Sequence, residues 1–151
     1  MSNPILESVA KALVINNDNQ VLILKLGEYK ERPEKSYKPD LPGGLVDPGE
    51  NEHDAVIREV LEETGIAVNP KLTSLVYSGT EFIADENKSV SKHLFICRVD
   101  SNLEVKLSWE HSSYEWHDLE ELQSKTVKLR AFYNEAIEYC FTNNILSIST
   151  S

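Results

Sequence analysis

Glutamates crowd into the stretch LPGGLVDPGENEHDAVIREVLEETGIAV, which runs from Leu41 to Val68. Glu59, Glu62 and Glu63 are three and four residues apart, so their side chains are neighbours on the surface of a helix. Like charges at this spacing destabilise an isolated helix by a few tenths of a kcal/mol per pair, so the cluster needs solvation or cations. Carboxylates are hard oxygen ligands that suit Mg²⁺ or Mn²⁺, and these ions bind phosphates at their remaining positions. The segment therefore predicts a divalent-metal site that handles phosphate esters.

The alternative is a solvated acidic face, and two features argue against it. Arg58 is the only Lys or Arg between Asn51 and Thr64, which is too few cations for a surface laced with salt bridges. A Pro-Gly-Gly turn and an Asp-Pro-Gly turn precede the helix, and glycines let a backbone come close to a ligand and expose its carbonyls. Both features favour the metal site.

The acidic stretch is expected to form a helix from Asn51 to Thr64. Asn51 is a suitable N-cap with Asp54 at the third helical position, and Gly65 is a natural C-terminal stop. A period of 100° per residue divides the helix into two faces. The core-facing stripe is expected to hold Val56, Ile57, Val60, Leu61 and Thr64. The opposite face is expected to hold Glu52, Ala55, Glu59, Glu62 and Glu63.

The remaining elements must position this helix. Apolar runs bounded by turn residues predict strands. These runs are residues 8–15, 20–26, 72–84 and 89–99, followed by a short extended piece at 112–119. Apolar residues at helical spacing predict an amphipathic helix over 128–144, and the tail 145–151 is expected to fray. Mixed strands with two helices indicate an α+β fold with a mixed sheet flanked by helices.

Composition limits the class of protein. The 151 residues suit one domain, 1–151, and carry a formal net charge of -10. The acidic balance argues against a nucleic acid polymer as partner, and the lysines of residues 25–38 alternate with glutamates as in a solvated loop. No run approaches a membrane span and no secretory signal begins the chain. Cys97 and Cys140 lie in apolar surroundings as in buried reduced thiols, so we expect a cytoplasmic protein.

The acidic stretch resembles the Nudix box. That motif is Gly, five residues, Glu, seven residues, then Arg-Glu-aliphatic-any-Glu-Glu-any-Gly-aliphatic. This chain matches it at every position with Gly44, Glu50 and the run from Arg58 to Ile66. The resemblance implies an α/β/α sandwich. It also implies Mg²⁺- or Mn²⁺-dependent hydrolysis of a nucleoside diphosphate linked to another group.

Roles for individual residues follow from the resemblance. It implies that Glu59, Glu62 and Glu63 bind the metal together with the backbone carbonyl of Gly43. It also implies that Arg58 and Glu50 form an orienting pair, with an ordinary surface ion pair as the alternative. Gly44 and Gly65 have structural positions within the box.

The general base remains open. The resemblance implies either Glu59 or a carboxylate from a loop outside the box. Glu110, six residues before Trp116, is the loop candidate, and Glu115 is a weaker one. His111 could act as a base or contact a phosphate, although an exposed loop histidine is the simpler interpretation.

Substrate choice lies outside the box. Tyr37 or Phe82 could stack a base, and core packing or simple exposure would explain either one equally well. We favour a small nucleotide such as a (d)NTP. The alternatives are a prenyl diphosphate, an inositol polyphosphate, or a nucleotide-binding regulatory module without catalysis. Many relatives form homodimers, so a homodimer is among the expected assemblies.

Overall fold

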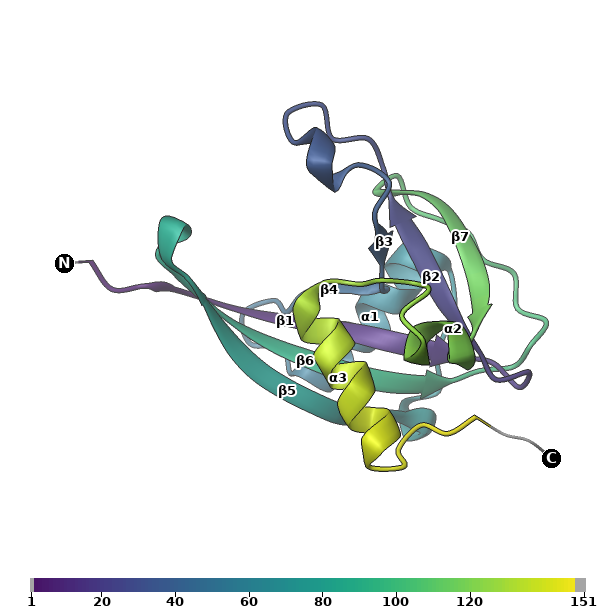
Figure 1. Ribbon diagram of the computed structural model, residues 1–151. Helices are drawn as coiled ribbons and strands as arrows, with labels where there is room; N and C mark the ends of the chain where they lie inside the picture. Colours follow the sequence, from purple (N-terminus) through teal and green to yellow (C-terminus); the bar gives the residue numbers. More distant parts are fainter. Residues whose placement is uncertain (1, 149–151) are drawn as a thin grey trace.

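Seven strands and three helices make up the computed structural model, which describes residues 2–148 (Figure 1). The strands are β1 (Ile5–Ile15), β2 (Gln20–Leu26), β3 (Pro39–Asp40), β4 (Gly43–Leu45), β5 (Thr73–Ile83), β6 (Lys88–Arg98) and β7 (His111–Asp118). The helices are α1 (Glu52–Thr64), α2 (Leu119–Gln123) and α3 (Ala131–Thr142). Short 3₁₀ turns are η1 (Pro33–Lys35), η2 (Pro70–Leu72) and η3 (Ala84–Glu86). The strands and helices expected from the apolar patterns are therefore present.

The sheet is mixed, with the strand order β3-β2-β1-β6-β5. The long central pair is parallel, and its register runs from Ile5 opposite Lys88 to Ile15 opposite Arg98. The β5–β6 hairpin is antiparallel, with η3 at its tip. Of the described residues, none belongs to a helix long and apolar enough to cross a membrane.

A split between β1 and β2 creates the place where the acidic helix meets the sheet. The two strands pair at Ile15 and Val21, after which β2 pairs with β7. The segment of residues 39–45 fills the opening, because β3 pairs with β2 and β4 pairs with β1. Gly43 and Gly44, which the sequence placed in a turn, are thereby paired with β1 as part of β4 inside the sheet.

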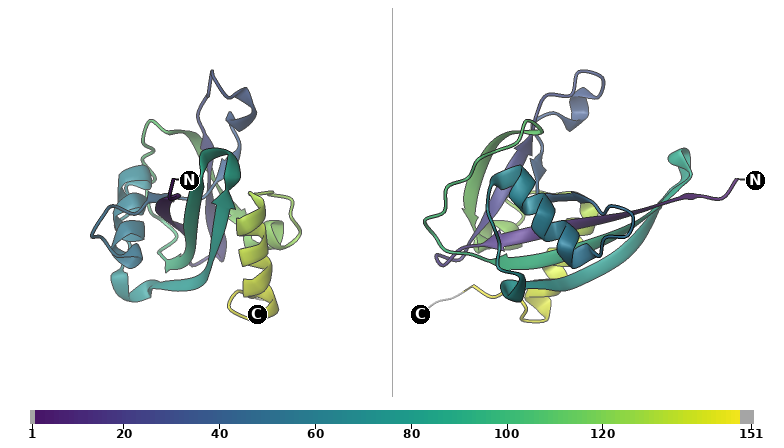
Figure 2. Two further views of the ribbon diagram at one scale, coloured as in Figure 1. Left: turned by 90° about the vertical axis from the view of Figure 1, so that its left-hand side faces the viewer. Right: turned by 180° about the vertical axis from the view of Figure 1, so that it is seen from behind.

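Two apolar clusters lie on opposite faces of the sheet. Alternate residues of β1 divide between them, with Ala12 and Val14 on the α1 side and Leu13 and Ile15 on the α3 side. Figure 2 shows α1 and α3 on either side of the sheet. The predicted α/β/α arrangement is confirmed. Cys97 and Cys140 are free thiols buried in opposite clusters, and burial raises the pKa of each to about 11.

The core-facing stripe predicted for α1 was wrong for three residues at its borders. Leu61 is 48% exposed, whereas Ala55 and Glu63 are buried. The helix packs against both β1 and β4, and the Gly43 amide of β4 donates to Oε1 of Glu63 at 3.2 Å, while Gly44 leaves room for the Glu59 carboxylate. The face turned toward the sheet is therefore rotated toward Glu63.

The expectation of a frayed tail from residue 145 was also wrong at its beginning. Leu146 is only 2% exposed and joins the cluster under α3, and Ile145 packs against it. The amides of both residues donate to the carbonyl of Cys140, which turns the chain back onto the helix. Residues 149–151 lie outside the described part of the chain.

Candidate functional site

Caps at both ends fix α1 directly after the glycine-rich turns. The Asn51 side chain accepts a hydrogen bond from the Asp54 amide at 2.8 Å. Gly65 has a φ of +74° and its N–H donates to the carbonyl of Leu61 at 2.9 Å. A left-handed residue at this place favours glycine. The caps set where the carboxylates of the helix stand relative to the turns.

Gly43 and Gly44 bring the backbone against those carboxylates. A Cβ on Gly43, whose φ is +138°, would clash with the carbonyl oxygen of Ala10 and lie 2.5 Å from the Cα of Lys11. A Cβ on Gly44 would lie 2.9 Å from the carboxyl carbon of Glu59. Close approach to β1 and a positive φ explain the glycine at 43, and close approach to the Glu59 carboxylate explains the glycine at 44.

Arg58 holds the outer carboxylates in place. Its Nε and Nη2 donate to the two oxygens of Glu50 at 2.8 and 2.9 Å, which is the bidentate fork. Its Nη1 lies 3.2 Å from both Glu59 and Glu62. The hydrogen bonds from Arg58 lower the pKa of Glu50 to about 2, helped by the amide of Asp47. Glu50 therefore stays ionised and anchors the arginine.

Glu59 and Glu63 are less solvated. Burial raises the pKa of both carboxyls, for Glu63 to about 8. Glu63 is 3% exposed, and its Oε1 accepts the Gly43 amide at 3.2 Å. Within residues 2–148, its Oε2 is buried without a hydrogen-bond partner. An unsatisfied buried carboxylate oxygen is costly, so a ligand for it is expected.

The donor set fits a hard divalent cation. Among the described residues, no three Asp, Glu, His or Cys side chains converge closely enough to hold an ion on their own. Arg58 binds Glu59 and Glu62, while Glu63 is turned to Gly43. Mg²⁺ usually takes only one or two carboxylates, keeps several waters and uses substrate phosphates as further ligands. Such an ion can join this site together with its substrate.

His111 is not the exposed loop histidine that the sequence suggested. Its side chain is 2% exposed, because it opens β7 opposite Leu26 of β2. Its Nε2 lies 3.0 Å from Asp40, and its Nδ1 lies 3.8 Å from Oε2 of Glu63. His111 therefore stands behind the carboxylate cluster, where substrate contact is blocked by burial.

A buried ion pair that the sequence did not reveal lies next to His111. The ammonium of Lys11 donates to Asp40 at 2.7 Å and to the carbonyl of Leu41 at 3.0 Å. Burial alone would raise the pKa of Asp40, but Lys11 and the hydrogen bond from His111 hold it well below its usual range. Lys11 and Asp40 are 29 residues apart, so only the pairing of β1 with β4 and of β2 with β3 brings them together.

The loop candidates for a general base differ. Glu110 is exposed, and its charge contributes to the raised pKa of Glu59. Its carbonyl accepts the amide of Gly27, which ties this loop to the one after β2. Glu115 is occupied by His117, whose Nε2 lies 3.1 Å away. Glu110 is thus the loop carboxylate with an electrostatic link to the cluster.

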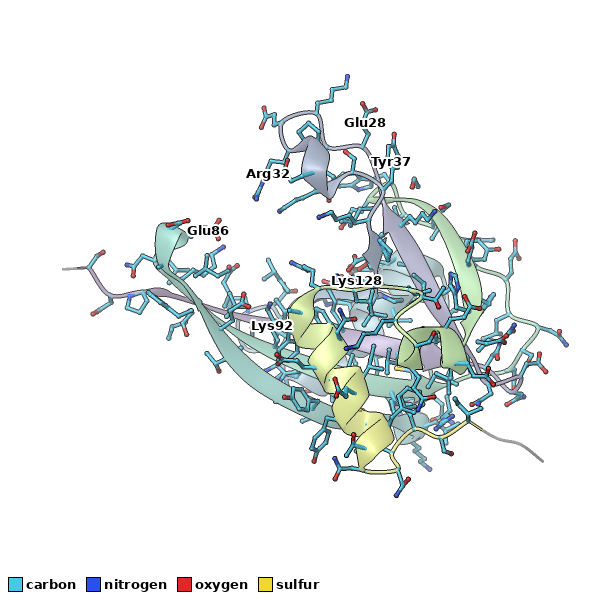
Figure 3. The ribbon with its side chains drawn as sticks, viewed as in Figure 1. Glu28, Arg32, Tyr37, Glu86, Lys92 and Lys128 are labelled. Carbon is cyan, nitrogen blue, oxygen red and sulfur yellow. The ribbon has the colours of Figure 1, made fainter. Side chains whose placement is uncertain are left out.

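Two predicted substrate contacts lie outside the cavities around this site. Tyr37 is exposed, and Figure 3 shows Tyr37 and Arg32 leaving the loop on opposite sides. Phe82 is exposed near the tip of the β5–β6 hairpin, next to Ile83. Neither residue lines a cavity beside the carboxylates.

Two cavities flank the loop between β2 and β3. We define the basic cleft as the larger one, with a volume of about 700 Å³. Its charged lining consists of Lys11, Arg32, Glu34, Lys35, Lys38, Asp40, Lys128 and Arg130. The second cavity, of about 480 Å³, is lined by Tyr29, Arg32, Trp109 and Glu110 among others. Trp109 is 90% exposed, so its aromatic ring next to Glu110 is accessible to a ligand.

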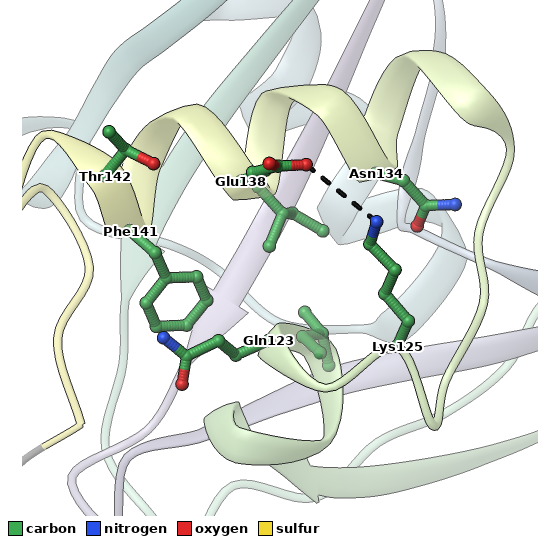
Figure 4. A pocket seen from close by; sticks show the side chains of 8 residues that line it. Gln123, Lys125, Asn134, Glu138, Phe141 and Thr142 are labelled. Atoms are coloured by element: carbon green, nitrogen blue, oxygen red, sulfur yellow. Dashed lines mark ion pairs between the residues drawn. The ribbon is translucent and has the colours of Figure 1, made fainter.

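A separate cavity of about 360 Å³ lies between α2 and α3 (Figure 4). Lys125 and Glu138 approach to 3.9 Å across it. Its lining includes no member of the carboxylate cluster, and an exposed ion pair of this kind contributes little. The carboxylate cluster beside α1 is therefore the candidate site.

Comparison with known proteins identifies the family. The model of the NUDIX domain matches residues 6–140. The chain belongs to the Nudix family. The crystal structure of the MutT protein from Methanosarcina mazei Go1 superposes with a TM-score of 0.77 and 29% identity, covering 95% of this chain and 99% of that one.

Curated Nudix relatives have several activities. The asymmetrical bis(5'-nucleosyl)-tetraphosphatase of Mus musculus is 38% identical over 53% of this chain and 55% of its own length. The ADP-ribose pyrophosphatase of Methanocaldococcus jannaschii is 37% identical over 76% of this chain and 64% of its own. A putative 8-oxo-dGTP diphosphatase of Bacillus subtilis is 34% identical over 71% and 63%. The chain thus spans less than two thirds of these relatives.

Proposed function

We propose that the chain is a hydrolase that cleaves a diphosphate bond in a small nucleotide-type substrate with the help of Mg²⁺ or Mn²⁺. The observation that carries this proposal is the carboxylate cluster beside Gly43 and Gly44 of β4, in which one oxygen of Glu63 has no hydrogen-bond partner among residues 2–148. Glu59, Glu62, Glu63 and the carbonyl of Gly43 would hold the ion. When bound, the ion neutralises charge that develops on the diphosphate oxygens.

The side chains of this Nudix chain have distinct tasks in the proposal. Arg58, itself anchored by Glu50, keeps Glu59 and Glu62 oriented before the substrate arrives. Glu110 takes the proton from the attacking water, since it is exposed and adjoins Glu59 electrostatically. Glu59 is the alternative base, because its raised pKa makes it a stronger proton acceptor.

The nucleoside part of the substrate has a surface available beside Glu110. Trp109 and Tyr29 both line the cavity of about 480 Å³, and an exposed tryptophan offers a face on which any base can stack. The names of the relatives concern different compounds, a tetraphosphate, ADP-ribose and 8-oxo-dGTP, all of which are nucleotides. We therefore propose a nucleotide in preference to a prenyl diphosphate.

A hydrolysis panel with Mg²⁺ and Mn²⁺ tests this function. The panel contains nucleoside triphosphates, nucleotide sugars, dinucleoside polyphosphates and prenyl diphosphates. We expect turnover of at least one nucleotide, and a loss of at least about 10²-fold in kcat for Glu62→Gln. Glu52→Gln is the matched control, because Glu52 lies on the same helix outside the network of Arg58. Full activity of Glu62→Gln, or no turnover of any compound, would reject the proposal.

A further inference from the structure

Two buried polar atoms face each other between β7 and α1. Nδ1 of His111 and Oε2 of Glu63 lie 3.8 Å apart, and the side chains that carry them are 2% and 4% exposed. Within residues 2–148, neither atom has a hydrogen-bond partner. An N–H···O hydrogen bond is about 2.9 Å long, so an approach of about 1 Å would join these two atoms and satisfy both.

The other nitrogen of His111 fixes the orientation of the ring. Nε2 lies 3.0 Å from Oδ2 of Asp40, whose Oδ1 accepts the ammonium of Lys11 at 2.7 Å. An ionised carboxylate can only accept hydrogen bonds, so Nε2 carries a hydrogen and donates it to Asp40. A histidine that is held at one nitrogen has a defined orientation at the other. Lys11 and Asp40 therefore direct Nδ1 toward Glu63.

The backbone also holds the two side chains near each other. The amide of Ser108 donates to the carbonyl of Glu63 at 3.2 Å, and the amide of Lys106 donates to the carbonyl of Thr64 at 2.8 Å. The amide of His111 in turn donates to the carbonyl of Ser108 at 3.4 Å. The connection between β6 and β7 is thus fastened to the end of α1, so the placement of His111 against Glu63 does not depend on side chains alone.

We propose that His111 is a positioning residue for Glu63, and that its Nδ1 donates a hydrogen bond to Oε2 when Glu63 holds the metal ion. Both ring nitrogens then donate, so the ring is a cation between two carboxylates. A carboxylate oxygen has two lone pairs, so Oε2 can accept this hydrogen bond and bind an ion at the same time. The inference rests on the metal site of the proposed function, and it adds a residue from outside the Nudix box to that site.

Two amide substitutions separate the nitrogens of His111. The amide of asparagine lies one bond closer to the backbone than that of glutamine. His111→Asn therefore keeps a donor near the place of Nδ1, toward Glu63, whereas His111→Gln keeps one near the place of Nε2, toward Asp40. Calorimetric titration with Mn²⁺ alone is expected to give a Kd about tenfold above wild type for His111→Gln, the scale for loss of a partner of a metal ligand, and close to wild type for His111→Asn.

The opposite order of affinities would overturn the inference. If His111 served only to hold Asp40, His111→Asn would bind Mn²⁺ more weakly than His111→Gln, because asparagine loses that contact. Equal affinities of the two variants would also overturn it. His117→Gln is the matched control, since His117 lies at the other end of β7 and pairs with glutamates outside the cluster, and its Kd should equal that of the wild type.

NMR of the wild type, labelled with ¹⁵N at histidine, requires no variant to fold. Adding Mg²⁺ is expected to shift the Nδ1 resonance of His111 more than its Nε2 resonance, because only Nδ1 gains a partner. An Nδ1 resonance that does not move at saturating Mg²⁺ overturns the inference.

The titrations contain no substrate, so they separate the two proposals. Mn²⁺ binding that responds to the His111 variants as expected, without turnover of any compound in the hydrolysis panel, would refute the proposed hydrolysis alone. Turnover that depends on Glu62, with a Kd for Mn²⁺ that His111→Gln leaves unchanged, would refute the role of His111 alone. A wild type that binds no Mn²⁺ without substrate refutes that role as well, and the hydrolysis panel still decides the function.

Discussion

The carboxylate face of α1 and the basic cleft have opposite charges, yet Lys11 and Asp40 join them. The acidic region is built from one continuous segment, with Glu59, Glu62 and Glu63 on a single helix. The basic region is assembled from β1, the loop after β2 and the residues before α3. One region is thus readable as a motif, whereas the other exists only after the chain has folded.

The two regions divide the proposed work. Carboxylates that hold metal ions act on the reacting phosphates, so changing them should lower kcat. Cations of the basic cleft would contribute to binding and not to the chemical step, so changing them should raise KM. Four further experiments challenge this division, beginning with the largest expected effect.

Asp40→Asn breaks the link between the regions. The ammonium of Lys11 would remain buried without its counter-ion, so we expect the free energy of unfolding to fall by about 3 kcal/mol. Urea denaturation in EDTA measures it. Glu34→Gln, in the exposed pair with Arg32, is the control and should leave the urea midpoint unchanged. Wild-type stability of Asp40→Asn would show that the two regions do not depend on this pair.

Glu110→Gln tests whether the acidic region extends beyond the helix. As the proposed general base it should lose about 10²-fold in kcat, with KM nearly constant. Glu115→Gln is the matched control, since Glu115 pairs with His117 and not with the cluster. An unchanged kcat for Glu110→Gln would return the role of base to Glu59.

Glu63 makes stability depend on pH. Its pKa is raised from 4.5 to about 8, so the folded chain binds this proton more tightly than the unfolded chain. The contribution to stability is complete below about pH 4.5 and is lost as the pH rises toward about 8. Glu63→Gln should therefore have a Tm above that of the wild type by roughly 5 °C at pH 8.5 in EDTA, and no higher at pH 4.5.

Adding Mn²⁺ to the same Tm measurements tests whether Glu63 is a metal ligand. Because a metal ligand must be deprotonated, Mn²⁺ should raise the Tm of the wild type more at pH 8.5 than at pH 5, and should affect Glu63→Gln less. Equal Mn²⁺ effects on the two proteins would remove Glu63 from the ligand set.

Trp109→Ala has the smallest expected effect. Loss of a stacking face should raise KM for nucleotides by about three- to tenfold, while kcat stays close to wild type. Leu103→Ala, another exposed apolar residue of the same connection, controls for loop perturbation. A KM that rises equally in both variants would argue against stacking on Trp109.

Regular spacing explains what could be predicted. Apolar runs bounded by turn residues located the five longer strands, and helical spacing located both long helices, because burial of an element imposes its pattern on the sequence. The caps Asn51 and Gly65 are local, since each depends on residues within one turn. The predictions were wrong where the burial of a residue depends on a distant segment that packs against it. Leu61 is exposed, and Glu63 is buried against β4, where its Oε1 accepts the amide of Gly43.

His111 shows why site residues outside a motif escape prediction. A histidine after a loop glutamate has no periodic or local signal, and its burial follows from the pairing of β7 with β2. Asp40 likewise has no local signal, because its partners Lys11 and His111 are 29 and 71 residues away along the chain. The one available signal was a lysine within the apolar run of β1, because a buried lysine requires a partner.

The amino-acid sequence by itself determined the helix, its caps, the succession of the longer strands along the chain and the carboxylates that define the Nudix box. These depend on spacing along one segment, which backbone geometry converts directly into position. Only the tertiary structure decided which carboxylates are desolvated, where His111 and Asp40 stand, and that scattered cations form one cleft. Those properties depend on which distant segments pack together and exclude water from one another. A local sequence pattern contains no information about that packing.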